Sequence, residues 1–85
     1  MNAIAWQAKA LRQLRKISAG SASEIRAAVS SELTDLTAAR NVKALVNHQY
    51  SYRLRVGNYR VFFEFDGGIR IVTIEEVRKR NERTY

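Results

Sequence analysis

A strict alternation of side chains over residues 50–56 is the feature that most constrains the fold. In the stretch Tyr-Ser-Tyr-Arg-Leu-Arg-Val, apolar residues occupy every second position, which is the period of a half-buried strand. Gly57 and Asn58 follow, and glycine at the first central position of a two-residue turn suits the type II′ geometry of a hairpin. We therefore predict an antiparallel hairpin whose return strand covers residues 59–65.

The predicted turn fixes the register of the hairpin, and the register decides which side chains share a face. Arg55 then lies opposite Arg60, and Arg53 lies opposite Phe62. The other face is apolar and comprises Tyr52, Leu54, Val56, Tyr59, Val61, Phe63 and Phe65. A shift of one residue would bury the arginines, so we expect one well-defined register.

The first half of the chain has a helical period instead. Residues 3–6 predict a short strand, and residues 7–17 predict a helix. Residues 18–20 are expected to break this helix, and Ser21 with Glu24 predicts the capping box of a second helix. Its apolar stripe is Ile25, Val29, Leu33 and Leu36. Residues 37–48 are expected to form a loop.

After the hairpin, residues 66–68 predict a second turn and residues 69–77 a third strand. This strand is apolar on both faces, which is typical of an interior strand. The predicted fold class is α+β, with an N-terminal strand, an αα-hairpin and then an antiparallel three-stranded meander. We expect the helices to pack on one face of the sheet and residues 1–85 to form a single domain.

The amino-acid composition limits the classes of partner that such a domain is expected to bind. The chain has 15 basic and 8 acidic residues, and its net charge of +7 attracts polyanions such as RNA, DNA or acidic proteins. With no cysteine and a single histidine, His48, which we interpret as a surface residue, we expect no metal site. No apolar run approaches the ~18 residues of a membrane span, and the N-terminus lacks the pattern of a secretion signal. We therefore expect a cytoplasmic protein without a membrane partner.

Three arginines share the polar face of the predicted hairpin. Arg55 and Arg60 lie directly opposite each other, an arrangement that destabilises a sheet. One interpretation is a solvated charged face whose repulsion Glu64 relieves. The other, which we favour, is an anion site in which guanidinium groups bind a phosphate bidentately.

The chain resembles the RelE/ParE toxin superfamily in the segment Tyr-Arg-Leu-Arg-Val-Gly-Asn-Tyr-Arg of residues 52–60 and in the tail Arg-Lys-Arg-Asn-Glu-Arg-Thr-Tyr of residues 78–85. The order of strand, two helices and three strands is similar too. The resemblance to the RelE branch implies a toxin of a type II toxin–antitoxin system that enters the ribosomal A site and cuts mRNA. It implies a metal-independent reaction without a cofactor, in which the 2′-hydroxyl attacks the adjacent phosphate. The implied partners are the ribosome, mRNA and a small acidic antitoxin.

The resemblance also implies roles for individual residues. The catalytic set is Arg53, Arg60, Arg80 and Tyr85, with Arg60 stabilising the transition state, Arg80 as the acid and Tyr85 as the base. Lys79 or Arg83 is an alternative acid, because the spacing of this tail differs from that of other members. The residues expected to hold RNA are Lys43, Arg55, Phe62, Arg78, Lys79 and Arg83.

Alternatives remain open for the base and for the activity. With a turn at Gly67 and Gly68, Glu75 falls opposite Arg60, either as a rival base or as the salt-bridge partner of this arginine. ParE-type members of the superfamily poison DNA gyrase and are not nucleases. A third hypothesis is a non-catalytic RNA-binding module that would keep the basic face but would not need Tyr85.

Overall fold

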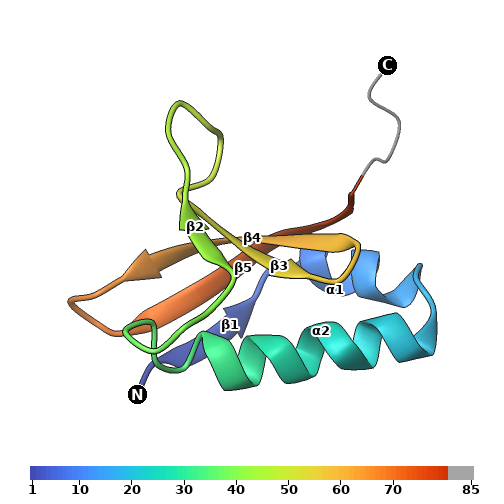
Figure 1. Ribbon diagram of the computed structural model, residues 1–85, viewed down its shortest axis with the longest axis horizontal. Helices are drawn as coiled ribbons and strands as arrows, with labels where there is room; N and C mark the ends of the chain where they lie inside the picture. The colour runs from blue at the N-terminus through green and yellow to red at the C-terminus, as the bar shows by residue number, and fades with distance from the viewer. Residues whose placement is uncertain (81–85) are drawn as a thin grey trace.

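The computed structural model describes residues 1–80 and places two helices on one face of a five-stranded sheet (Figure 1). The elements in chain order are β1 (Ala3–Trp6), α1 (Ala8–Arg15), α2 (Ala19–Glu32), β2 (Val42–Ala44), β3 (Tyr52–Val56), β4 (Tyr59–Asp66) and β5 (Ile71–Lys79). The strand order is β1-β5-β4-β3-β2, with β1 parallel to β5 and the other neighbours antiparallel. The predicted α+β class is confirmed, and β5 is an interior strand. No helix among the described residues is long and apolar enough to cross a membrane.

The register of the β3–β4 hairpin is confirmed. Arg55 pairs with Arg60 and Arg53 with Phe62. Gly57 has a φ of +55°, in the left-handed region that the first position of a type II′ turn requires. Local pattern and turn chemistry therefore determine this part of the sheet.

The core lies between the apolar face of the sheet and the two helices. Leu54, Val61 and Phe63 are buried on the sheet, as predicted, and pack against apolar side chains of the helices. The buried residues that the helices and the end of α2 contribute are Ala10, Leu14, Ala22, Ile25, Val29 and Leu33. Burying one face leaves the opposite face of the sheet, with its arginines, free of helices.

The predicted start of α2 is wrong. The helix begins at Ala19, and Ser18 is its N-cap, with its hydroxyl oxygen accepting a hydrogen bond from the backbone N–H of Ser21 at 3.1 Å. Serine is among the preferred N-cap residues, and Ser18 takes this role three residues before the predicted cap. Ser21 and Glu24 therefore lie within the helix. Because α1 ends at Arg15, before the predicted end of the first helix, the connection between the helices keeps its predicted length of three residues.

Two predictions about strands also need correction. The expected loop of residues 37–48 contains β2, a strand too short to show a period of its own, which forms because it pairs with β3. The third strand begins at Ile71 instead of Ile69, because the turn runs through Gly67, Gly68 and Ile69 to Arg70. A β-bulge then shifts the register between Phe62 and Phe63.

Candidate functional site

Ten side chains line a hollow of about 500 Å³ on the face of the sheet that the helices leave free. We call it the basic pocket, and its lining residues are Lys43, Leu45, His48, Arg53, Arg55, Arg60, Phe62, Arg78, Lys79 and Arg80. Seven of these ten are lysine or arginine. Several RNA-binding and catalytic residues predicted from the sequence therefore come together here.

Pairing across the sheet explains how distant parts of the chain meet in this pocket. Arg55, Arg60 and Arg78 form one row across β3, β4 and β5. The neighbouring row contains Lys43 and Arg53, because β2 pairs with β3. Like charges side by side destabilise a sheet, so the rows favour a site that binds an anion over one shaped by stability alone.

A buried carboxylate that the sequence analysis missed contacts two residues of the basic pocket, Phe62 and Arg78. Glu76 is only 4% exposed and pairs with Phe62 across the strands. It accepts hydrogen bonds from the hydroxyl of Tyr50 at 2.9 Å and from Nζ of Lys9 at 3.4 Å, and Nε of Arg78 binds its other oxygen. A carboxylate buried in an interior strand needs such partners, and a glutamate within a strand predicted to be interior was the signal that the sequence offered.

These contacts determine the protonation of both groups. Burial alone would raise the pKa of Glu76, but the hydrogen bonds from Arg78 and Tyr50 and the charge of Arg78 outweigh burial and lower the pKa below its usual value. Burial raises the pKa of Tyr50, and its hydrogen bond to Glu76 raises it further. At neutral pH the pair therefore consists of an ionised carboxylate and a neutral phenol that donates to it.

The ring of Phe62, which we expected to stack on a base, is covered. Phe62 is 4% exposed, and the ring of His48 stacks on it with centroids 5.1 Å apart and planes 16° from parallel. The ring of Tyr50 lies 5.5 Å from it, and the guanidinium carbon of Arg78 lies 5.6 Å from its centroid. A base would reach Phe62 only if these side chains moved.

The predicted position of Glu75 opposite Arg60 is wrong. The longer turn moves the pairing partner by two residues and the bulge by one more, so that Arg78 takes this place. Glu75 lies at the bulge and is half-buried. It is therefore not the cross-strand partner of Arg60.

The start of the predicted catalytic tail does lie at the pocket. Arg80 is one of the lining residues, and its backbone N–H donates a hydrogen bond to the carbonyl oxygen of Asn58 at 2.5 Å. The tail thus leaves β5 beside the β3–β4 turn. Arg83 and Tyr85 lie outside the described residues.

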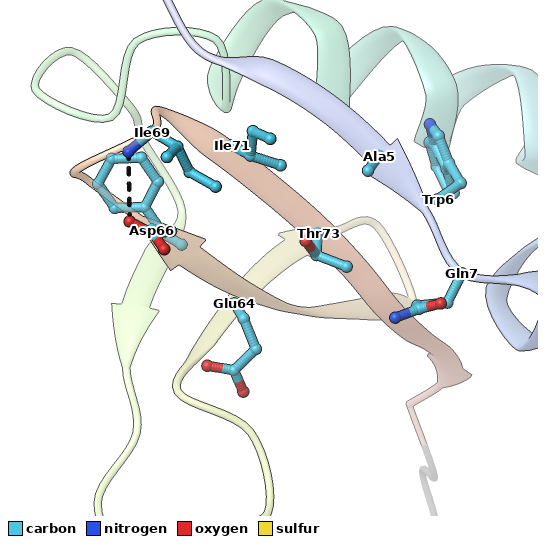
Figure 2. A pocket seen from close by; sticks show the side chains of 9 residues that line it. Ala5, Trp6, Gln7, Glu64, Asp66, Ile69, Ile71 and Thr73 are labelled. Carbon is cyan, nitrogen blue, oxygen red and sulfur yellow. Dashed lines mark hydrogen bonds between the residues drawn. The ribbon is translucent and has the colours of Figure 1, made fainter.

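A second hollow, of about 480 Å³, lies toward the opposite end of the same sheet (Figure 2). We call it the carboxylate hollow, and it is lined by Ala5, Trp6, Gln7, Glu64, Phe65, Asp66, Ile69, Ile71 and Thr73. Glu64 accepts a hydrogen bond from the backbone N–H of Ser51 at 3.0 Å, and Asp66 accepts from the backbone of Gly68 and Ile69 at 2.9 and 3.3 Å. Both carboxylates therefore support the local backbone.

Comparison with known proteins decides the family. A family model described as the ParE toxin of the type II toxin–antitoxin system parDE matches residues 4–84. The chain belongs to the RelE/ParE superfamily of type II toxins. No match was found among curated protein sequences.

Solved structures show that the toxin shares its fold with RelE proteins. The isolated RelE toxin of Escherichia coli superposes with a TM-score of 0.79 at 15% identity, over 99% of this chain and 89% of that chain. The toxin–antitoxin complex RelBE2 from Mycobacterium tuberculosis gives a TM-score of 0.74 at 20% identity, over 93% of this chain and 98% of that chain. The archaeal RelB–RelE complex from Methanococcus jannaschii gives 0.71 at 18%, over 88% of each chain. At these identities the likeness establishes the fold.

Proposed function

We propose that this type II toxin is a ribosome-dependent endoribonuclease that cleaves mRNA without a metal ion. The observation that carries the proposal is the basic pocket, in which seven cationic side chains surround a hollow of about 500 Å³. In the proposed reaction the 2′-hydroxyl of the RNA attacks the adjacent phosphorus and the 5′-oxygen leaves. The products are a 2′,3′-cyclic phosphate and a free 5′-hydroxyl.

The row of Arg55, Arg60 and Arg78 supplies the electrostatic part of this chemistry. Guanidinium groups bind phosphate oxygens bidentately, and a pre-positioned cation stabilises the negative charge that develops in the transition state. Arginine keeps its proton at neutral pH, so the main role of these side chains is to bind and stabilise charge. Lys43 and Arg53 in the next row extend the surface along the RNA strand.

Proton transfer is assigned to the tail, following the resemblance to RelE-type toxins. We propose Tyr85 as the base, with Arg80 as the acid and Lys79 or Arg83 as alternatives. Glu75 is retained as a candidate base because it is half-buried and does not pair with Arg60. Glu76 is a poor candidate, because three donors already occupy its oxygens.

A variant series tests this assignment in one assay. Tyr85→Phe removes only the hydroxyl, so RNA binding should persist while cleavage on programmed ribosomes falls by ~10²–10⁴. Glu75→Gln should cleave at close to the wild-type rate. A Glu75→Gln variant that is inactive beside an active Tyr85→Phe variant would transfer the role of base to the carboxylate.

A second candidate function is poisoning of DNA gyrase, and the match to a family model of ParE toxins favours it. The two activities differ in their targets. A ribosome-dependent nuclease stops translation first and cuts messages within translated codons, which primer extension detects. A gyrase poison leaves mRNA intact, traps cleaved DNA and induces the DNA-damage response.

The deciding experiment is induced expression of the toxin in a cytoplasm free of its antitoxin. We expect growth arrest, an early loss of translation and cuts in translated mRNA, all relieved by a small acidic antitoxin that covers Arg53 or Arg60. The control variant is Arg26→Ala, which removes one exposed charge from α2 without touching the basic pocket and should therefore arrest growth as the wild-type toxin does. Intact mRNA with cleaved chromosomal DNA would assign the toxin to the gyrase poisons.

A further inference from the structure

We propose that His48 is a stacking platform for a nucleobase of the bound RNA, adjacent to the row of arginines. The inference rests on the proposed nuclease function and names a substrate-positioning residue within it. His48 lines the basic pocket and is exposed, whereas the ring of Phe62 beneath it is buried. The aromatic surface available to a base is therefore provided by the histidine.

The imidazole is held in a fixed plane from below. Its ring stacks on Phe62 with centroids 5.1 Å apart and planes 16° from parallel. Its Nδ1 atom accepts a hydrogen bond from the backbone N–H of Tyr50 at 3.0 Å. Asn47 adopts a left-handed backbone conformation just before it, with a φ of +54°. A ring fixed in this way binds a planar partner at a lower entropic cost than a freely rotating side chain.

Tyr50 is anchored in turn. Its hydroxyl donates a hydrogen bond of 2.9 Å to Glu76, and burial with this bond raises the pKa of Tyr50, so the phenol stays protonated and keeps donating. Glu76 belongs to an interior strand and also binds Lys9 of α1. The loop that carries His48 is thus tied to an interior strand of the sheet and, through Glu76, to α1.

The same contacts argue against a role for His48 as the general base. Because Nδ1 accepts the Tyr50 N–H, the neutral ring carries its proton on Nε2 and has no free lone pair there. The imidazole can still present its outer face to a nucleobase. Every nucleobase has a π-face, so this platform would position single-stranded RNA with little preference for sequence, while the arginines hold the neighbouring phosphates.

The test measures binding of a short oligoribonucleotide with 2-aminopurine beside a 2′-O-methylated, uncleavable linkage. Stacking on an aromatic residue contributes enough that His48→Ala should weaken binding by about 5- to 150-fold and reduce the quenching of 2-aminopurine. His48→Phe keeps the aromatic face but loses the Nδ1 acceptor of the Tyr50 N–H, so it should bind and quench within a few-fold of the wild type and clearly better than His48→Ala. Tyr50→Phe, which removes only the hydroxyl that anchors the loop, should weaken binding less than His48→Ala.

The outcomes separate this inference from the proposed function. Wild-type toxin that cleaves mRNA, with His48→Ala binding the oligonucleotide as tightly as the wild type, would overturn the platform and leave the nuclease standing. Binding by His48→Phe as weak as that of His48→Ala would also overturn it, because an aromatic face at this position would then contribute nothing to binding. Wild-type toxin that neither binds the oligonucleotide nor cleaves mRNA on the ribosome would overturn the proposed function itself.

Discussion

Two hollows of similar size lie on the same face of the sheet and differ in what their charges do. In the carboxylate hollow, Glu64 and Asp66 accept hydrogen bonds from the backbone and stabilise local structure. In the basic pocket, Arg78 is the one lining cation that forms an ion pair with a carboxylate within residues 1–80. Volume is therefore a poor guide to function in a domain this small. Charge that the described structure leaves without an internal counter-ion is a better guide.

The residues that pair across neighbouring strands explain why the two ends of the sheet differ in charge. At the basic end, three arginines lie side by side across β3, β4 and β5. At the other end, Glu64 pairs with Thr73, which pairs in turn with Ala5, so no like charges meet in that row. The repulsion at the basic end is tolerated because the neighbouring core residues bury apolar surface on the opposite face. A bound polyanion would relieve it.

The largest expected effect is on mRNA cleavage, in a comparison of two single variants that each remove one positive charge from a different end of the sheet. Arg60→Ala should reduce single-turnover cleavage of mRNA on programmed ribosomes by about two to three orders of magnitude, because it removes a pre-positioned charge from the scissile phosphate. Arg70→Asn removes the same charge beside the carboxylate hollow and tolerates the left-handed φ of +58° at this position. It should cleave within a few-fold of the wild-type rate. Equal losses in both variants would mean that net charge alone matters.

A second test compares the carboxylates of the two ends through stability. Glu76→Ala leaves Tyr50 and Arg78 without their acceptor and should lower the free energy of unfolding by about 1–3 kcal/mol. Asp66→Ala removes exposed hydrogen bonds to the turn and should cost about 1 kcal/mol or less. Urea unfolding measures both. A larger cost for Asp66→Ala would contradict the view that Glu76 anchors the basic end.

The pH dependence of stability sharpens the same comparison. The pKa of Glu76 is lower in the folded protein than its usual value of 4.5. The ionised carboxylate therefore contributes its full stabilising free energy when the pH is above the pKa of Glu76 in the unfolded chain. The contribution is lost as the pH falls through the folded-state pKa. Unfolding free energies measured from pH 6 down to pH 3 should therefore fall less steeply for Glu76→Gln than for the wild type. Glu24→Gln, on the exposed side of α2, is the control, and wild-type behaviour of Glu76→Gln would exclude this linkage.

The part of the fold that could be predicted from the sequence is the part that local chemistry determines. Alternation over residues 52–56, with glycine at the turn, was enough to give the register of β3 and β4 and to place Arg53, Arg55 and Arg60 on one face. The stripe of α2 likewise identified Ile25, Val29 and Leu33 as buried. In these segments each residue's preference agrees with its tertiary environment.

The parts that could not be predicted depend on partners distant in sequence. β2 is a strand only because β3 lies beside it, and the bulge in β5 follows from its pairing with β4. The pairing of β2 brings Lys43 to the basic pocket, and the bulge together with the longer turn places Arg78, instead of Glu75, opposite Arg60. The covering of Phe62 by His48 is likewise a contact between a loop and a strand. No periodicity within either segment encodes it.

The smallest expected effect is on the free energy of unfolding, in a comparison of variants in the two turns at the ends of β4. At the basic end, Gly57 has a φ of +55° and no atom within 4 Å of the position that a Cβ would take, so Gly57→Ala tests backbone strain alone. It should lower the free energy of unfolding by about 1–2 kcal/mol, the cost of a left-handed alanine. At the other end, Arg70 already adopts a φ of +58°, so Arg70→Gly relieves strain but increases the entropy of the unfolded chain. These terms oppose each other, and we expect a change below about 1 kcal/mol in urea unfolding. If Gly57→Ala were neutral while cleavage fell, the turn would act through the position of Arg80, whose N–H binds Asn58, instead of through stability.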